Sequence, residues 1–167
     1  MEYKDGDTFL DEYIAYDAKL AAKRPGILVV HDWLGVGPNV KRNVEKLAAL
    51  GYTAMAADIY GKGVRPSPEE APKVAGKWRD GDRAALRKRA RAGLDFLAKH
   101  KTVDSKRLAA TGYCFGGTTV LELARSGAPL KGIVSFHGGL GTPKSEDAKN
   151  IKGKVLALHG ADDPFVK

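Results

Sequence analysis

Short runs of consecutive apolar residues alternate along the chain with longer stretches in which apolar residues recur every three or four positions. The continuous runs, rich in branched residues, are typical of strands buried on both faces of a sheet. They lie at 27–31, 52–57, 107–111, 132–136 and 154–158. The periodic stretches predict helices at 38–50, 69–78, 82–100 and 118–125. This alternation predicts an α/β fold, with a mostly parallel sheet covered by helices on both faces.

The N-terminal residues follow a different pattern. Asp5-Gly6 has turn chemistry, and apolar and polar positions mix from Thr8 to Tyr16, which together predict a hairpin. No internal repeat, low-complexity tract or long linker divides the 167 residues. We therefore expect a single domain that spans residues 1–167 and has a core of its own.

Composition narrows the class of protein. Hydrophobic residues make up 43% of the chain and charged residues 29%, as in ordinary globular proteins. No apolar run approaches the roughly 20 residues that cross a bilayer. The start of the chain is polar and acidic, which is unlike a signal peptide. We therefore expect no membrane partner and a cytoplasmic location.

The net charge of +8 raises the question of nucleic acid. Basic residues concentrate in one predicted helix and just beyond it, at Arg83, Arg87, Lys88, Arg89, Arg91, Lys99 and Lys101. The stretch has neither a recognition-helix pattern nor an RNA-binding signature. The pattern favours a solvated helix face, and we expect no nucleic-acid partner.

A single cysteine, Cys114, excludes an internal disulfide, and no Cys/His spacing indicates a zinc site. We expect neither a metal nor a cofactor. A lone cysteine is either a small buried apolar residue or a reactive thiol. The segment Gly112-Tyr113-Cys114-Phe115-Gly116-Gly117 favours the thiol, because it lies between a predicted strand and a predicted helix. In a nucleophile elbow, small residues on both sides of the nucleophile let a strained turn close.

An elbow cysteine at a helix N-terminus carries further expectations. Free N–H groups and the helix dipole favour an anion there, which predicts a lowered pKa for the Cys114 thiol. An oxyanion hole needs two N–H donors, and we assign them to Phe115, the residue after the nucleophile, and Trp33, in the loop after the first buried strand. The expected acid is Asp163, preferred over Asp162, in the turn after 154–158. An ordinary Asp-rich turn before proline is the alternative.

These segments resemble the dienelactone hydrolase family, also called carboxymethylenebutenolidases, over almost the whole chain. The matching segments are His31-Asp32-Trp33-Leu34-Gly35-Val36, Ala57-Asp58-Ile59-Tyr60-Gly61, the elbow, and His159-Gly160-Ala161-Asp162-Asp163-Pro164-Phe165-Val166. The resemblance implies the α/β-hydrolase fold and hydrolysis of small esters or lactones through an acyl-cysteine on Cys114, with Asp163 orienting a histidine. It also implies that Asp32 holds the position of an acidic residue that contacts the resting thiol. Lys62 and Arg65 would be the cations near a substrate carboxylate.

The histidine of the expected triad is missing. In this fold the order along the chain is nucleophile, acid, histidine. Four residues follow Asp163, and none of them is histidine. His137 could approach Cys114, because its strand should neighbour the elbow strand, but the order along the chain argues against it. We therefore expect the histidine beyond Lys167, and a fold that lacks its last strand and helix.

Two functions remain open because of this gap. The chain is either part of an ester or lactone hydrolase, or a catalytically impaired small-molecule-binding domain that keeps the elbow pocket. In the shortened fold, the strand at 154–158 forms an exposed edge, and an apolar sheet face lacks its covering helix. Such surfaces favour association, which predicts a homodimer.

Overall fold

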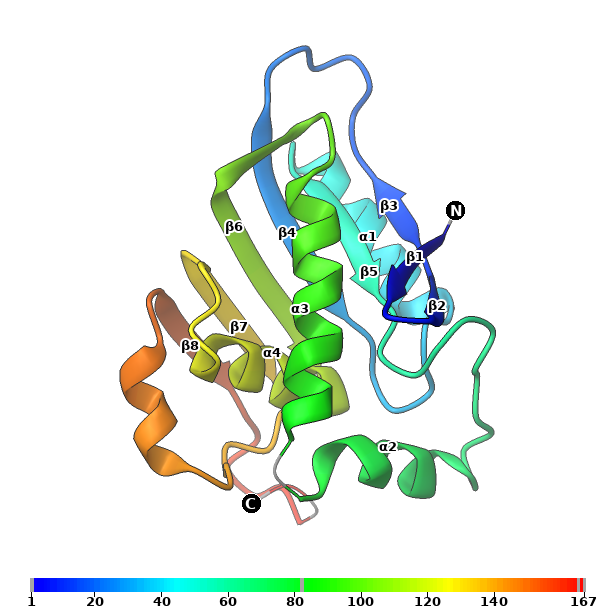
Figure 1. Ribbon diagram of the computed structural model, residues 1–167, viewed down its shortest axis with the longest axis vertical. Coiled ribbons are helices and arrows are strands. Elements are labelled where there is room, and N and C mark those ends of the chain that lie inside the picture. Colours follow the sequence, from blue (N-terminus) through cyan, green and yellow to red (C-terminus); the bar gives the residue numbers. More distant parts are fainter. Residues whose placement is uncertain (1, 82, 165, 167) are drawn as a thin grey trace.

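A six-stranded sheet forms the centre of the computed structural model, which describes residues 2–81, 83–164 and 166 (Figure 1). In spatial order, its strands are β3 Tyr13–Ala15, β5 Thr53–Ala57, β4 Arg24–Val30, β6 Val103–Tyr113, β7 Gly132–Phe136 and β8 Lys154–Leu158. β3 pairs antiparallel with β5, and all other neighbours in this sheet are parallel. The predicted α/β fold with a mostly parallel sheet is confirmed.

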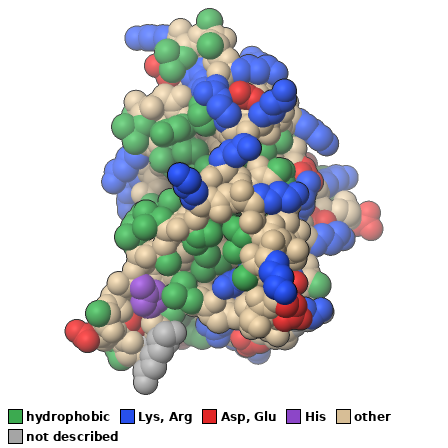
Figure 2. All heavy atoms as spheres, turned by 90° about the vertical axis from the view of Figure 1, so that its left-hand side faces the viewer, with side chains coloured by type: hydrophobic (Ala, Val, Ile, Leu, Met, Phe, Trp, Pro, Cys, Tyr) green, Lys and Arg blue, Asp and Glu red, His purple; other side chains and the backbone are tan. Residues whose placement is uncertain are grey.

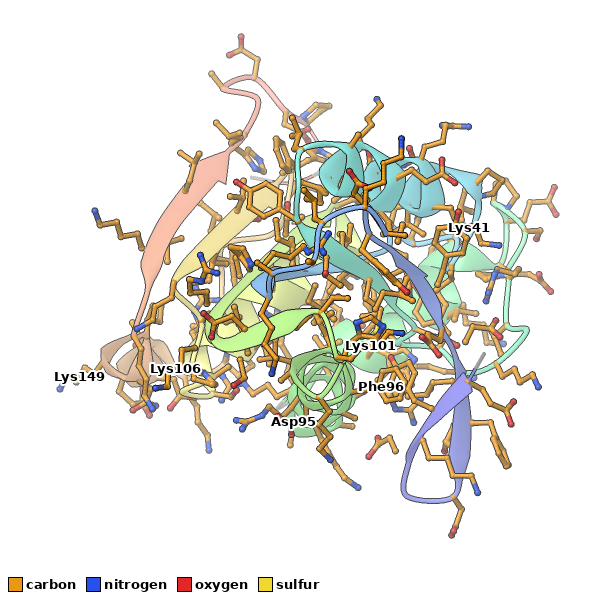
Figure 3. All side chains as sticks on the ribbon, turned by 90° about the horizontal axis from the view of Figure 1, so that it is seen from above. Lys41, Asp95, Phe96, Lys101, Lys106 and Lys149 are labelled. Atoms are coloured by element: carbon orange, nitrogen blue, oxygen red, sulfur yellow. The ribbon has the colours of Figure 1, made fainter. Side chains whose placement is uncertain are left out.

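Helices cover both faces of the sheet (Figure 3). They are α1 Pro38–Ala49 on one face, and α3 Ala84–Ala98 and α4 Phe115–Arg125 on the other. Side chains alternate along each strand, so Val29 and Ala56 pack against α1. Leu28, Met55 and Ile133 pack in the larger core beneath α3 and α4. None of the described helices is long and apolar enough to span a bilayer, and the expected location stays a prediction.

The N-terminal hairpin is present, but it is shorter than the sequence pattern predicts. β1 Glu2–Asp5 and β2 Thr8–Asp11 pair antiparallel as a separate two-stranded sheet. The following residues leave the hairpin, because β3 joins the edge of the main sheet instead. Tyr3 and Leu10 are buried in the core that includes α3, so the hairpin closes one end of that core.

Element boundaries differ most at the elbow. α4 begins at Phe115 instead of residue 118. The sequence-based prediction began too late, because the glycines in the first turn of this helix have a low helix propensity. α2 Ala71–Arg79 and α3 fall within the predicted helical stretches to a few residues. Asp82, the predicted start of the second stretch, lies outside the described residues, as do Phe165 and Lys167 at the chain end. The 3-10 helix η1, Ser145–Asn150, buries no residue, so it leaves no apolar stripe in the sequence.

Basic side chains of α3, and that of Arg83 directly before it, are paired with carboxylates. Arg83 and Arg87 bind opposite oxygens of Glu122 on α4, at 3.2 and 2.7 Å. Glu122 is completely buried. Arg89 pairs with Asp5 of the hairpin at 2.8 Å. The predicted solvated helix face is wrong for these three arginines, because they join α3 to its neighbours.

One edge of the sheet is exposed. All five residues of β8 are exposed, and Leu156 keeps 51% of its surface accessible. Figure 2 shows hydrophobic side chains gathered on this side of the molecule, between Lys and Arg side chains. The exposed edge predicted at 154–158 is therefore present in the described part of the chain, whereas the homodimer stays a prediction.

Candidate active site

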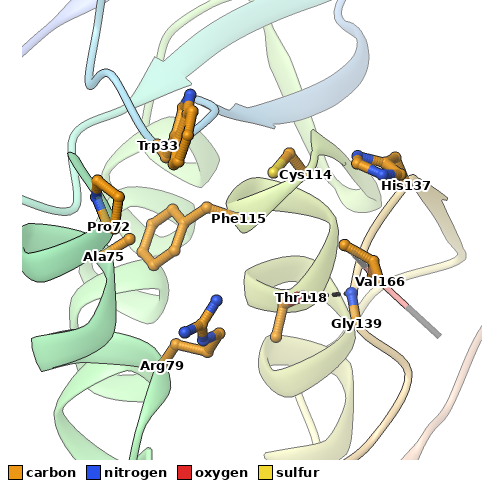
Figure 4. A pocket seen from close by; sticks show the side chains of 10 residues that line it. All are labelled: Trp33, Pro72, Ala75, Arg79, Cys114, Phe115, Thr118, His137, Gly139 and Val166. Carbon is orange, nitrogen blue, oxygen red and sulfur yellow. Dashed lines mark hydrogen bonds between the residues drawn. The ribbon is translucent and has the colours of Figure 1, made fainter. Parts of the chain in front are cut away.

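The loops that follow β4, β6, β7 and β8 meet at one edge of the sheet, because these parallel strands end on the same side. Together with α2 they enclose a cavity of about 180 Å³ (Figure 4). It is lined by Trp33, Pro72, Ala75, Arg79, Cys114, Phe115, Thr118, His137, Gly139 and Val166. The elbow cysteine therefore opens onto a small cavity of mixed polarity.

Cys114 lies in the sharp turn between β6 and α4. Its φ of 55° and ψ of −114° are strained for a residue with a side chain. A Cβ on Gly116 would lie 2.3 Å from the carbonyl oxygen of Val30, so only glycine lets the turn approach β4 this closely. The Cys114 N–H donates to the carbonyl oxygen of Phe136 at 2.8 Å. The strand, strained turn and helix expected of a nucleophile elbow are present.

Burial raises the pKa of the Cys114 thiol above its ordinary value. A hydrogen bond from the Phe115 N–H lowers this pKa, and so does the charge of Arg79. The charges of Asp32 and Asp163 raise it. The sequence-based expectation of a lowered pKa is wrong, because burial outweighs the helix N-terminus. The thiol therefore needs a proton acceptor before it can attack as a thiolate.

Both residues predicted as oxyanion donors line the cavity. Phe115 opens α4, where the first N–H groups have no partner within the helix. Trp33 lies on the loop after β4, and the Tyr60 hydroxyl donates to its carbonyl oxygen at 3.1 Å. His31, at the end of the same strand, is completely buried, and its Nε2 accepts a backbone N–H from the next loop. Burial lowers the pKa of His31, which fits a neutral ring that supports the loop.

Four other predicted site residues do not line the cavity, and one of them, Asp163, contacts the lining residue His137. The Asp32 carboxylate accepts hydrogen bonds from the Leu34 N–H at 2.9 Å and from the Asn39 side chain at 3.2 Å. Lys62 pairs with a carboxylate of β1 and Arg65 with one of β2, each at 2.6 Å. These two cations join the hairpin to the loop after β5.

Two residues with basic side chains that sequence reasoning did not assign to the site do line it. His137 lies in the cavity wall, and its Nε2 is 2.5 Å from Oδ2 of Asp163. The order of the triad along the chain argues against His137, so only the neighbouring position of its strand could have indicated it. Arg79, at the end of α2, points into the cavity (Figure 4). An arginine in the last turn of a helix carries no motif that marks it as functional.

The cavity thus combines a thiol, an imidazole paired with a carboxylate, a guanidinium and backbone donors at a helix start. With these groups, the sulfur can attack a carbonyl carbon, and the backbone donors can stabilise the negative charge that develops on the carbonyl oxygen. Within the described ranges, no group of three or more His, Cys, Asp or Glu side chains is placed to hold a metal ion.

Comparison with known proteins points to one family. The profile of the dienelactone hydrolase family matches residues 10–167. The chain belongs to the dienelactone hydrolase family. Among solved structures, m3DLH is 45% identical with a TM-score of 0.95, and the match covers 100% of this chain and 70% of m3DLH. A dienelactone hydrolase-like promiscuous phosphotriesterase from metagenomic libraries, P91, is 42% identical with a TM-score of 0.95, over 99% of this chain and 69% of P91.

Curated relatives are more distant. "Protein usf" of Aquifex pyrophilus is 29% identical over 146 residues, which are 85% of this chain and 63% of that protein. A Bradyrhizobium protein named "Probable 2-oxo-3-(5-oxofuran-2-ylidene)propanoate lactonase" is 28% identical over 99% of this chain and 71% of its own length. The chain therefore spans somewhat under two thirds of the first of these relatives. The α/β-hydrolase fold of the family agrees with the sheet and helices described above.

Proposed function

We propose that this chain carries the nucleophile site of a hydrolase that cleaves small esters or lactones through an acyl-cysteine intermediate. The observation that carries the proposal is the strained elbow turn of Cys114, which opens onto a cavity that also holds an imidazole and a cation. A cavity of about 180 Å³ fits a small acyl group. Membership of the dienelactone hydrolase family and the lactonase name of the Bradyrhizobium relative support this substrate class.

The roles of the residues follow from the chemistry of acyl transfer. Cys114 attacks the acyl carbon, and the N–H groups of Phe115 and Trp33 bind the developing oxyanion. Asp163 stabilises a histidine imidazolium. Asp32 is a positioning residue, because its carboxylate holds the turn that carries Trp33.

The cation placed to bind a substrate carboxylate is not one of the two that the sequence indicates. Lys62 and Arg65 are paired with carboxylates of the hairpin. Arg79 lines the cavity beside Cys114, and the one carboxylate that it contacts among the described residues is the exposed Asp80, at 3.3 Å from its Nε. We therefore assign the binding of an anionic substrate group to Arg79.

Hydrolysis of p-nitrophenyl acetate by the 167-residue chain tests the proposal. Cys114→Ala removes the nucleophile, so we expect turnover to fall to the uncatalysed rate. Iodoacetamide should abolish the wild-type activity equally, because the chain contains one thiol. Mass spectrometry of the rapidly quenched enzyme should show one acetyl group, and it should be missing from Cys114→Ala. Turnover that persists unchanged in Cys114→Ala would rule the function out.

Phosphotriesters are a second candidate substrate class. The observation in their favour is the similarity to P91, which is named as a promiscuous phosphotriesterase and is 42% identical over 99% of this chain. A thiolate can attack phosphorus from the same elbow position as it attacks an acyl carbon. Release of p-nitrophenolate from paraoxon by the wild-type chain, and its loss in Cys114→Ala, would support this class. Release of p-nitrophenolate that does not depend on Cys114 would rule out phosphotriesters as substrates of this site.

A further inference from the structure

Two buried side chains hold the backbone on either side of Trp33, the residue that carries the second proposed oxyanion donor. They are His31, directly after β4, and Tyr60, in the loop after β5. We infer that His31 and Tyr60 are positioning residues, which together aim the Trp33 N–H at the cavity beside Cys114. This inference rests on the proposed function, because it concerns the oxyanion hole of the same hydrolytic site.

The surroundings of His31 determine which of its ring nitrogens carries the proton. Its Nε2 accepts a hydrogen bond from the Ile59 N–H at 3.2 Å, so the lone pair is on Nε2. Burial lowers the pKa of this completely buried ring and keeps it neutral. In a neutral imidazole whose Nε2 accepts, the proton is on Nδ1. The Nδ1 lies 2.5 Å from the Asp32 carbonyl oxygen, so it donates a hydrogen bond to that oxygen.

The carbonyl that His31 holds belongs to the same peptide group as the Trp33 N–H. No peptide bond among the described residues is cis, so the peptide between Asp32 and Trp33 is trans. In a planar trans peptide, the C=O and the N–H point in opposite directions. His31 therefore fixes the direction of the Trp33 N–H by holding the carbonyl on the other side of the peptide. In the described part of the chain this N–H has no protein acceptor, so it is available to a substrate oxygen.

Tyr60 holds the next peptide group of the same loop. Its hydroxyl donates to the Trp33 carbonyl oxygen at 3.1 Å, and the Leu34 N–H of that peptide donates to the Asp32 carboxylate at 2.9 Å. With the His31 contact, both peptide groups that flank Trp33 are held by side chains. A donor that is held in place before the substrate binds costs no reorganisation when the oxyanion forms.

The same two rings also contact the residue that carries the first oxyanion donor. The Phe115 ring stacks on the His31 ring, with centroids 5.7 Å apart and planes inclined by 17°, and its centroid lies 5.2 Å from that of Tyr60. The centroids of the His31 and Tyr60 rings are 4.7 Å apart. A Cβ on Gly116 would lie 2.6 Å from the His31 carbonyl oxygen, so the first turn of α4 packs directly against this backbone. The three rings therefore fix how the two donor residues lie relative to each other.

This cluster of three rings acts through the backbone and not on the substrate. Trp33, Cys114 and Phe115 line the cavity (Figure 4), whereas His31 and Tyr60 do not. Burial raises the pKa of the Tyr60 hydroxyl, and nearby negative charge raises it further. The hydroxyl therefore stays protonated and keeps donating to the Trp33 carbonyl when the thiolate forms.

Tyr60→Phe removes the hydroxyl and keeps the ring. We expect kcat for p-nitrophenyl acetate to fall by about tenfold to 100-fold, because a misplaced donor stabilises the oxyanion less. KM should change by less than about twofold, since the hydrogen bond to the oxyanion forms in the transition state. Tyr52→Phe is the matched control, because Tyr52 lies directly before β5 and does not line the cavity. It should leave both constants unchanged, whereas an unchanged kcat in Tyr60→Phe would overturn the inference.

Two substitutions of His31 separate positioning from the filling of space. The side-chain amide of asparagine reaches the place of Nδ1 and can still donate to the Asp32 carbonyl, whereas the amide of glutamine reaches the place of Nε2. For His31→Asn we expect kcat within about tenfold of wild type. For His31→Gln we expect a fall of about 100-fold to 1000-fold, the range for loss of one oxyanion donor. Space filling alone would favour the larger glutamine, so an equal or higher kcat in a folded His31→Gln would overturn the inference.

NMR of the Trp33 amide tests the inference without any turnover. The chain contains two tryptophans, so labelling with ¹⁵N-tryptophan gives two backbone amide signals, and Trp78→Phe assigns them. In Tyr60→Phe we expect the order parameter of the Trp33 amide to fall from about 0.85, typical of rigid backbone, toward about 0.6. Trp78 lies within α2 and is the internal reference. An order parameter and a chemical shift of Trp33 that are both unchanged would overturn the inference.

Failure of the inference and failure of the proposed function give different results. If Cys114→Ala abolishes turnover while Tyr60→Phe keeps kcat, the hydrolase stands and the positioning role is overturned. If wild-type turnover is independent of Cys114, the proposed function fails, and the NMR signals of Trp33 alone decide the inference. Thermal unfolding shows whether each His31 variant keeps the fold. If neither does, Tyr60→Phe, which loses one hydroxyl, supplies the decisive result.

Discussion

At the scale of single residues, the state of the Cys114 thiol depends on a balance between burial and nearby charge. Burial raises its pKa, and the positive charge of Arg79 opposes that effect. About half of the Arg79 side chain is exposed, so solvent weakens its influence. Even a modest cationic contribution changes the thiolate fraction, because that fraction falls tenfold for each pKa unit.

Replacing Arg79 should therefore slow the reaction of the thiol. In Arg79→Gln, we expect the rate of Cys114 alkylation by iodoacetamide at pH 8 to fall roughly threefold, which corresponds to about half a pKa unit. Lys77→Gln is the control, because it removes a cation from the same helix that does not line the cavity. Equal rates in the two variants would show that the charge of Arg79 does not reach the thiol.

The residues of the site were predictable only where chemistry is local in sequence. The glycines around Cys114 mark the elbow because the turn itself requires them. The pKa of the thiol was predicted in the wrong direction, because burial depends on side chains far away in the chain. His137 and Arg79 enter the site through strand register and helix placement. Neither property is visible in a short motif.

At the scale of elements, α4 shows how packing overrides propensity. Gly116 and Gly117 disfavour a helix, yet α4 begins at Phe115. A Cβ on either glycine would collide with neighbouring strands or loops. Only glycine therefore fits at the start of this helix, where it packs closely against the sheet. The same helix carries Glu122, which is buried beside Arg125 of α4, Arg87 of α3 and the residue directly before α3, Arg83. The polarity of this glutamate gave no hint of its burial.

Removing the charge of Glu122 should destabilise the contact between α3 and α4. Burial by itself raises the pKa of this carboxyl, but hydrogen bonds from Arg87 and Arg125 lower it below its ordinary value. For Glu122→Gln we expect the free energy of unfolding at pH 7 to fall by about 3 kcal/mol, the cost of breaking a buried ion pair. Glu69→Gln, at an exposed position, should change it by less than about 0.5 kcal/mol.

The pH dependence of that loss follows from the sign of the shift. The folded-state pKa of Glu122 is lower than its unfolded value of about 4.3. Its ion pairs therefore stabilise the fold above that pH, and the stabilisation is lost as the pH falls through the folded-state pKa. Urea unfolding at pH 7 and at pH 3.5 should show the difference between wild type and Glu122→Gln shrinking at the lower pH. A constant difference would mean that the effect is one of packing.

At the scale of the whole molecule, the fold was predictable and the surface only in part. Alternation of continuous and periodic apolar stretches gave the strands, the helices and the parallel arrangement, because burial on two faces leaves a strong sequence signal. The charged surface was not predictable, because the partners of Arg83, Arg87 and Arg89 lie on other elements. The exposed edge at 154–158 was also expected from the sequence, and β8 has a strand neighbour on one side only among the described residues.

That edge makes a prediction about association. Val155, Leu156 and Leu158 are each exposed by more than 40% on β8, whose outer side has no neighbouring strand among the described residues. An apolar edge strand of this kind pairs readily with another copy. We expect the wild-type chain to show a molar mass that rises with concentration in light scattering. Leu156→Lys should suppress the rise, since a lysine on an edge strand opposes pairing.

Leu50→Lys tests whether any exposed leucine would give the same result. Leu50 is 73% exposed at the end of α1, away from the sheet edge. The same charge added there should leave association unchanged if β8 is responsible. Equal suppression by both variants would point to net charge instead, because the chain already carries +8. Loss of association in Leu156→Lys alone, with hydrolysis of p-nitrophenyl acetate retained, would show that the edge and the Cys114 cavity act independently.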